Sequence, residues 1–236
     1  MRALSGELLL EAWERAVAEP ELVRALTLLG LALPEADREQ LAAMPVAERN
    51  LMLLRLHELS FGPRLDAVAS CHRCGAPFEF SVPVADLMAT ATTPPDGDVL
   101  EWREEGGRYR LRQLNTDDLL ASLEVADPRE AQEVLLTRCL VASPAERSGP
   151  SSGVLEKFDE LNAGVELTCT MPCPECASEE IVDLDVARFL WIEVRRAASQ
   201  LLRDVHDLAS AYGWSERSIL ELDVRRRTAY LELLGR

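Results

Sequence analysis

The chain has 236 residues, 47% of them apolar and 28% charged, which is typical of a globular protein with a substantial core. Its 41 acidic residues outnumber 25 basic residues and give a formal net charge of −16 at pH 7. Such a surface repels phosphate backbones and anionic lipids, so general nucleic-acid or membrane binding is not expected. No apolar run approaches the ~20 residues that span a bilayer, and acidic residues interrupt the apolar N-terminal stretch, unlike a secretory signal. We therefore expect a cytoplasmic protein.

Residues 1–62 contain three helical patterns. The first begins after Ser5, a suitable N-cap, and the second begins near Pro20, which suits a first helical turn. The third carries Leu59 among its apolar residues and stops at Gly62. These apolar faces indicate helices that pack together in a core, with no polar group placed for chemistry.

The middle of the chain mixes strand and helix patterns. Residues 99–114 hold two alternating runs around a Gly-Gly pair, which predicts a central β-hairpin. Two short helices follow, and Thr116 is the expected cap of the first. Residues 143–153, rich in Ser and Pro, predict a mobile loop.

Two Cys-x-x-Cys pairs carry the clearest chemical signal. Cys71 and Cys74 form the first pair, and Cys173 and Cys176 follow it at a spacing of 102 residues. The same shift superimposes an alternating apolar run and a helix start behind each pair. The matched positions are Phe80 with Val182, Val82 with Leu184, Val84 with Val186, Ala85 with Ala187, and Leu87 with Phe189. One such knuckle in each half suggests a pseudo-twofold arrangement that brings the two pairs together.

Four thiolates in two such pairs are the ligand set of a tetrahedral structural zinc ion. A site closed by four sulfurs has no open position for water or substrate, so we expect Zn²⁺ to staple two distant parts of the chain. Two alternatives remain open, a redox pair at CPEC and thiols without a metal. The redox alternative needs its first cysteine at a helix N-terminus, whereas each pair here precedes a strand pattern.

Other cysteines and histidines have simpler interpretations. Cys169 and His72 lie close enough to the pairs in sequence to substitute as ligands. Cys139 lies on an apolar helix face and is expected to be a buried core thiol. The chain shows no Ser-His-acid set, no Gly-rich phosphate loop and no His-x-x-x-His pair, so we do not expect an enzyme or a small-molecule substrate.

The C-terminal region has a distinctive pattern. A long helix is predicted from about Ala187 to Ala211, and two short helices capped by Ser215 and Asp223 follow it. The turn between the long helix and the first short helix holds Tyr212 and Trp214, which are candidate partner-binding residues. The last helix carries consecutive arginines, of which Arg225 and Arg226 are candidates as well. Interface hot spots favour Trp, Tyr and Arg, which makes this turn a candidate partner surface. Alternatively, Trp214 folds back onto the long helix as a staple.

Helices joined by tight turns with adjacent arginines also suggest a zinc-containing, helix-turn-helix-like nucleic-acid-binding regulator. The net charge opposes this alternative function. The apolar residues of the segment also need burial, which favours a packed helical cap. They are Ile219, Leu220, Leu222, Tyr230, Leu231 and Leu234.

Three stretches carry a family resemblance: HELSFGPRLDAVASCHRCG, the CPEC knuckle leading into DVARFLWIEV, and AYGWSERSILELDVRRRTAYLEL. Together they resemble the baseplate hub assembly chaperones of T-even-type contractile phage tails and related contractile injection systems. The resemblance implies a non-enzymatic assembly chaperone or adaptor whose partners are hub or spike proteins of the baseplate. It brings no catalytic residues, and the zinc expectation rests on the cysteine spacing alone.

The expected architecture is an α+β protein that is mainly helical. It consists of an N-terminal helical part (1–62), a zinc-knuckle and hairpin region with two short helices (63–190), and a C-terminal helical cap (191–236). Because the two knuckles would share one zinc ion, we expect these parts to form one intertwined unit.

Overall fold

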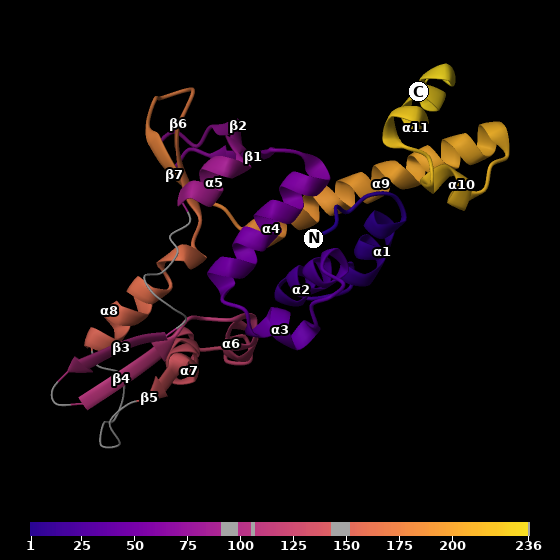
Figure 1. The fold of residues 1–236 in the computed structure, drawn as a ribbon. Helices are drawn as coiled ribbons and strands as arrows, with labels where there is room; N and C mark the ends of the chain where they lie inside the picture. Colours follow the sequence, from indigo (N-terminus) through magenta and orange to yellow (C-terminus); the bar gives the residue numbers. More distant parts are fainter. Residues whose placement is uncertain (91–98, 105–106, 143–151, 236) are drawn as a thin grey trace.

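The computed structural model describes residues 1–90, 99–104, 107–142 and 152–235 and shows an α+β protein that is mainly helical, as predicted (Figure 1). The Pro-rich break at 91–98 and residues 143–151 of the predicted loop lie outside the described residues, and residues 152–153 begin a helix instead of ending the loop. Among the described helices, none combines the length and apolarity needed to cross a membrane.

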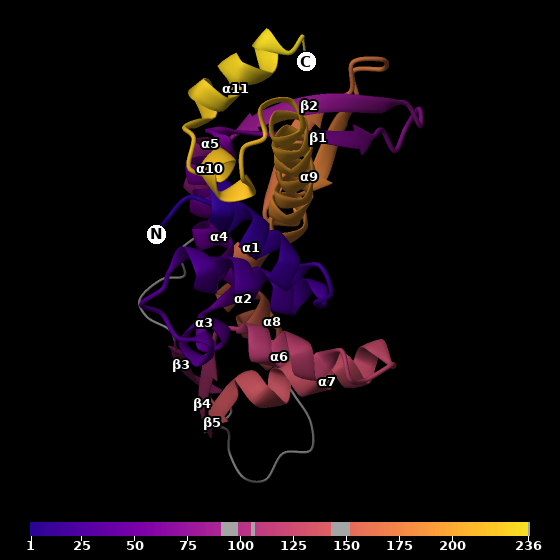
Figure 2. The same cartoon turned by 90° about the vertical axis from the view of Figure 1, so that its right-hand side faces the viewer.

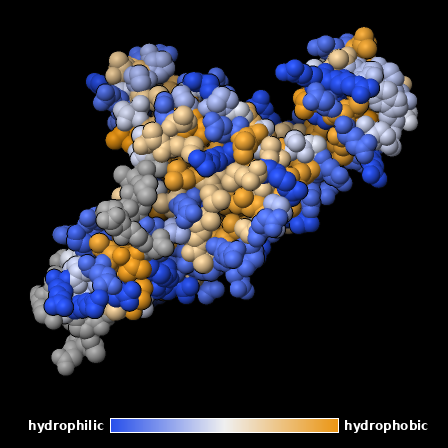
Figure 3. Space-filling model, viewed as in Figure 1, coloured by the Kyte–Doolittle hydropathy of each residue, from blue (hydrophilic) through white to orange (hydrophobic). Residues whose placement is uncertain are grey.

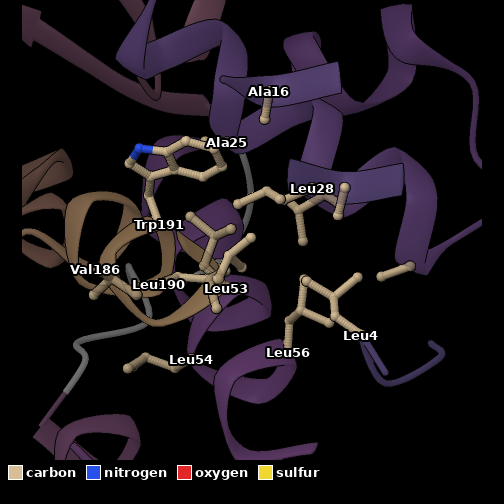
Figure 4. Close-up of a cluster of buried hydrophobic side chains, with 14 of the residues drawn as sticks. Leu4, Ala16, Ala25, Leu28, Leu53, Leu54, Leu56, Val186, Leu190 and Trp191 are labelled. Atoms are coloured by element: carbon tan, nitrogen blue, oxygen red, sulfur yellow. The ribbon is translucent and has the colours of Figure 1, made fainter. Parts of the chain in front are cut away.

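A helical body forms the centre of the molecule. It consists of α1 (Gly6–Ala16), α2 (Glu21–Ala32), α3 (Arg38–Ala43), α4 (Val46–Phe61) and the first half of α9 (Val186–Tyr212). Figure 4 shows Leu28 and Leu53 from the N-terminal helices meeting Leu190 and Trp191 of α9 in one buried cluster. Burying each such side chain contributes about 1.5–3 kcal/mol, so the N-terminal helices and α9 stabilise one another despite their separation in sequence.

Two local expectations within these helices need correction. Leu59 is 54% exposed, because α4 turns Leu53, Leu54 and Leu56 toward its neighbours instead. Ser5 occupies the N-cap position of α1, but its side chain makes no capping hydrogen bond.

Thr116 does not cap its helix either. The cap is Asn115, whose side-chain oxygen accepts a hydrogen bond from the Asp118 backbone N–H at 3.0 Å. Thr116 is buried, and its hydroxyl accepts a hydrogen bond from Arg49 of α4. Burial beside a cation therefore takes precedence over the local capping preference of threonine.

An insertion lobe, residues 99–161, lies between the two knuckles in sequence and at one end of the molecule (Figures 1 and 2). Its antiparallel sheet has the order β3-β4-β5. The strands are β3 (Val99–Glu104), β4 (Gly107–Arg112) and β5 (Leu140–Ala142), and the helices are α6 (Thr116–Ser122), α7 (Pro128–Cys139) and α8 (Ser152–Leu161). The lobe has its own core, in which Cys139 is fully buried as predicted, and burial raises the pKa of this thiol to about 12.

A buried carboxylate ties the lobe together. Asp118 of α6 accepts hydrogen bonds from Arg112 of β4 at 2.6 and 2.8 Å and from Arg138 of α7 at 2.8 Å. Burial alone would raise the pKa of Asp118, but the two arginines and the Asn115 backbone N–H outweigh it and hold the pKa below its ordinary value. One side chain thus connects a strand and two helices.

The far half of α9 extends beyond the body and carries a C-terminal hook, which we define as residues 212–235 (Figures 1 and 2). Gly213 ends α9 in the left-handed conformation with φ of 67°, which glycine adopts without strain. The hook contains α10 (Glu216–Leu220) and α11 (Val224–Leu233), and Ser215 and Asp223 cap them as predicted.

A buried histidine lies within the body. His57 of α4 is 3% exposed, its ring lies against Phe61, and its Nδ1 has no hydrogen-bond partner among the described residues. Burial lowers the pKa of His57, although Glu193 and Asp66 partly oppose the shift. The imidazole is therefore neutral in the folded protein at neutral pH.

We expect His57→Leu to remove part of the acid sensitivity of folding. Below the ordinary histidine pKa of about 6.5, the unfolded chain binds a proton at His57 that the folded chain does not bind, so stability falls by up to about 1.4 kcal/mol per pH unit. Urea unfolding at pH 7.5 and 5.5 should show a smaller loss for His57→Leu than for the natural chain. His206→Gln, a change of an exposed histidine on α9, is the matched control and should keep the natural slope. Equal slopes in His57→Leu and the natural chain would contradict the prediction.

Candidate metal centre

Two antiparallel hairpins repeat the same backbone geometry. The first pairs β1 (Arg64–Ser70) with β2 (Pro77–Pro83), and the second pairs β6 (Thr168–Pro172) with β7 (Glu179–Asp183). The innermost pairs are Ser70 with Pro77 and Pro172 with Glu179, so adding 102 to the first register gives the second. The helices that follow begin at the same offset, α5 (Val84–Thr90) at Val84 and α9 at Val186. The repeat seen in the sequence is thus a repeat of structure.

The turn of each hairpin is held by two equivalent backbone hydrogen bonds. In the first knuckle, Cys71 N–H donates to the Ala76 carbonyl at 3.0 Å and Gly75 N–H to the Cys71 carbonyl at 2.9 Å. In the second, Cys173 N–H donates to the Ser178 carbonyl at 2.8 Å and Ala177 N–H to the Cys173 carbonyl at 2.9 Å. Each turn folds back sharply enough to place both of its thiols on one side.

The two knuckles bring four sulfurs together. The Sγ atoms of Cys71, Cys74, Cys173 and Cys176 all lie within 4.8 Å of one another. Contacts across the two halves are 3.6 Å between Cys71 and Cys176 and 3.7 Å between Cys74 and Cys173. A tetrahedron of sulfurs at about 2.3 Å from a central ion has edges of about 3.8 Å. The cluster therefore has the size and donor chemistry to hold one tetrahedral metal ion.

The surroundings of the cluster differ on its two sides. Cys71 and Cys173, the first cysteines of the knuckles, are buried, and with Phe78 they form a small apolar cluster of their own. Cys74 is exposed and Cys176 is half-buried. The site thus has a buried inner side and an outer side open to solvent, which gives an ion a path of entry.

Backbone N–H groups act on the inner sulfur of the second knuckle. Burial raises the pKa of the Cys173 thiol, but N–H groups of Cys176 and Glu175 and neighbouring thiols outweigh it and lower the pKa to about 7. Because only thiolates bind a metal ion, this knuckle has a ligand that deprotonates readily near neutral pH.

Glu180 contributes to the site and was not foreseen from the sequence. Its side chain, although on β7, reaches the first knuckle, where it accepts hydrogen bonds from the Cys71 thiol at 2.9 Å and the His72 backbone N–H at 3.1 Å, and it also contacts His72 Nδ1. The carboxylate is buried, and these contacts hold its pKa well below the ordinary value. Glu180 therefore connects the second hairpin directly to the first knuckle.

The internal repeat offers the one sequence signal that marks Glu180. Subtracting 102 from its number leads to Phe78, a buried aromatic side chain in the same position of the first hairpin. A charged residue in a strand position that is apolar in the other half indicates a specific partner. That partner lies 108 residues earlier, which no local pattern reveals.

The two substitute ligands do not join the cluster. Cys169 lies on β6 and packs against the main core, outside the four-sulfur group. The His72 ring faces Glu180 instead of the sulfurs. The donor set of the cluster is therefore four cysteines.

The C-terminal candidate residues lie on the hook, away from the cluster. Tyr212 and Trp214 stack with ring centroids 4.8 Å apart, and Tyr230 of α11 meets the edge of both rings at 5.7 and 4.9 Å. Arg225 and Arg226 are exposed on α11. The rings staple α11 to the end of α9, and the arginines remain free to meet solvent or a partner.

The α9 helix links the two sets of candidate residues. It has 27 residues, which corresponds to a length of roughly 40 Å, and it leads from the second hairpin to the hook. The cluster and the hook are thus separate regions, connected by the second hairpin and one continuous helix.

Comparison of the chain with protein-family models, with curated proteins and with solved structures found no match in any of the three.

The residue directly after the second cysteine of each knuckle allows the same backbone conformation to be tested in both halves of the repeat. Gly75 has φ of 74° and Ala177 has φ of 54°, so both adopt the left-handed conformation, which is unfavourable for a side chain. We expect Gly75→Ala to lower the free energy of unfolding by about 1 kcal/mol and Ala177→Gly to raise it by about 0.5–1 kcal/mol.

Urea unfolding at constant metal content measures both changes. Ala69→Gly in the extended strand β1 is the control and should lower stability, since glycine there adds entropy to the unfolded chain and removes a methyl group packed beside Cys71 and Phe78. A loss of stability in Ala177→Gly equal to that of the control would contradict the predicted turn conformation.

Proposed function

We propose that the four-cysteine cluster binds one structural Zn²⁺ ion. The observation that carries the proposal is the pair of sulfur contacts at 3.6 and 3.7 Å between knuckles that lie about a hundred residues apart in the chain. Zinc with four thiolates is tetrahedral and has no open coordination position, so the ion would hold the fold and take no part in a reaction.

A zinc ion at this position would couple the two halves of the chain. Because the unfolded chain has no preformed site, the free energy of zinc binding becomes free energy of folding. Glu180 supports the same junction through the His72 backbone N–H, a contact that remains when Cys71 gives up its proton to bind the metal. The redox alternative receives no support from the geometry, because each cysteine pair lies in a turn between strands and not at a helix N-terminus.

Elemental analysis of the purified protein should give about one zinc ion per chain. Cys74→Ser is expected to lose most of this zinc and to unfold at lower temperature, because it removes one of the four ligands. Cys169→Ser is the matched control, since this thiol lies outside the cluster, and it should keep the natural zinc content. Protein with no bound metal after expression in zinc-supplemented medium would refute the zinc site.

We further propose that the chain is a non-enzymatic assembly chaperone or adaptor for the baseplate hub of a contractile phage tail or contractile injection system. The three stretches that carry the resemblance follow one path through the molecule: from α4 through β1 to the first knuckle, from the second knuckle into α9, and then along the hook. A path that joins the helical body, the two knuckles and the hook suits a protein that binds and positions another protein. The acidic net charge of −16 favours such a role over contact with nucleic acid.

The hook is the proposed partner surface. Figure 3 shows apolar side chains of the hook enclosed by hydrophilic ones, and Tyr212 remains 38% exposed beside Trp214. Arg225 and Arg226 project from α11, whereas the next arginine, Arg227, is buried beside Asp204 at 3.4 Å. Two exposed arginines on the helix that meets the exposed Tyr212 ring through Tyr230 fit an acidic patch on a hub or spike protein.

The double variant Arg225→Ala/Arg226→Ala should weaken capture of the hub or spike protein at least tenfold and leave thermal stability unchanged, because both side chains are exposed. The measurement is a pull-down with the tagged chain co-expressed with individual baseplate subunits, followed by affinity measurement of the complex. Arg195→Ala/Arg196→Ala, an exposed arginine pair on α9, is the matched control. Unchanged affinity would remove the hook as the partner surface. Strongly salt-dependent retention of DNA would instead support the nucleic-acid-binding alternative.

A further inference from the structure

A pocket of about 600 Å³ lies where the helical body meets the insertion lobe. It opens among the first turns of α2, α4 and α9 and one side of α6. Leu22, Leu119, Leu123 and Leu184 contribute to a largely apolar lining. Its volume is within the range of pockets that bind small molecules or single side chains of a partner.

A buried cation lines this pocket. Arg49 of α4 is 4% exposed, and its guanidinium donates to the Asn50 side-chain oxygen at 3.0 and 3.3 Å and to the Thr116 hydroxyl at 3.0 Å. These bonds use three of the five N–H donors of an arginine. Among the described residues no carboxylate forms an ion pair with it, and Asp185 acts on it only through space.

A buried charge without a paired counter-ion is costly. Burial lowers the pKa of Arg49, which reflects the loss of hydration around the cation. The neutral oxygens of Asn50 and Thr116 orient the guanidinium but leave its positive charge uncompensated. A carboxylate in the pocket would supply the missing charge and accept the two remaining N–H donors in a bidentate arrangement. The positive ends of α2, α4 and α9 favour the same sign of charge.

The rim of the pocket has the opposite charge. Its exposed carboxylates are Glu21, Glu166, Asp183 and Asp185. Asp185 acts on Arg49 through space, but solvent screens all four exposed carboxylates, so they weaken the attraction of Arg49 for an anion without cancelling it. They do favour a cation at the mouth. The pocket therefore fits a ligand with a carboxylate at its inner end, an apolar body and a positive charge a short distance behind.

We propose that this pocket binds the carboxyl terminus of a partner polypeptide, with its last, apolar residue inside and a basic residue before it at the rim. A small free carboxylic acid would pair with Arg49 but would offer no positive charge to the carboxylates at the rim. An internal segment of a protein has no terminal carboxylate attached to an apolar residue. The inference deepens the proposed role of holding another protein and gives that role a second contact. It does not depend on the hook or on the identity of the partner.

The probe is the tripeptide acetyl-Arg-Gly-Leu with a free terminal carboxylate, titrated into the full-length protein. We expect saturable binding, with shifts of amide NMR signals in residues 119–123 and 183–187. The same peptide ending in a carboxamide should bind at least tenfold more weakly, because it presents no charge to Arg49. This comparison uses the natural chain, so it does not depend on the folding of any variant.

Two variants test the two charges separately. In Arg49→Gln, the free acid and the carboxamide should bind equally, since the cation that distinguishes them is gone. Glu166→Gln/Asp183→Asn should weaken acetyl-Arg-Gly-Leu about fivefold and leave acetyl-Gly-Gly-Leu unchanged. Glu156→Gln/Asp159→Asn on α8 changes the same number of exposed charges outside the pocket and should have no effect.

The inference fails if the free acid and the carboxamide bind the natural chain alike, or if neither shows saturable binding up to 10 mM. It also fails if 4-methylpentanoate binds as tightly as the tripeptide, since the carboxylates at the rim would then contribute nothing to binding. None of these titrations contains a baseplate subunit. The result therefore stands apart from the co-expression test of the hook, and either can fail while the other succeeds.

Discussion

The fold depends on the meeting of two knuckles that the chain places about a hundred residues apart. Each knuckle is locally determined, since a hairpin of fixed register and a left-handed turn residue suffice to place its two thiols. Their meeting is not local, and it rests on the cluster of sulfurs, on Glu180 and on the packing of α9 into the helical body. The same contact defines where α9 begins, and therefore where the hook lies relative to the body.

Sequence patterns predicted those features that depend on neighbouring residues. The helix that ends at Gly62, the caps Ser215 and Asp223, and the burial of Cys139 all follow from short-range preferences. The four-cysteine set could be predicted because the turn chemistry occurs twice with the same spacing. The short helix α3 was missed, since its six residues give too little periodicity to recognise.

Contacts between distant segments account for what the sequence did not reveal. Thr116 carries an ordinary capping side chain, but Arg49, far away in sequence, recruits its hydroxyl into the junction between body and lobe. Glu180 lies in a strand that contains both polar and apolar residues, and only the folded chain shows that it accepts a hydrogen bond from the opposite knuckle. Such residues acquire their roles from tertiary partners, and comparison of the two repeats marks Glu180 but not Thr116, which lies between the repeats.

The insertion lobe lies in sequence entirely between the first and second knuckles. With a metal ion joining Cys71 and Cys74 to Cys173 and Cys176, the lobe becomes part of a closed loop whose two ends meet at one point. Mechanical tension applied between the N-terminal helices and the hook would then pass from α4 through β1 and the metal centre into α9. The lobe would carry none of that tension, and its internal bonds, including those around Asp118, would remain unloaded while the rest of the molecule is pulled.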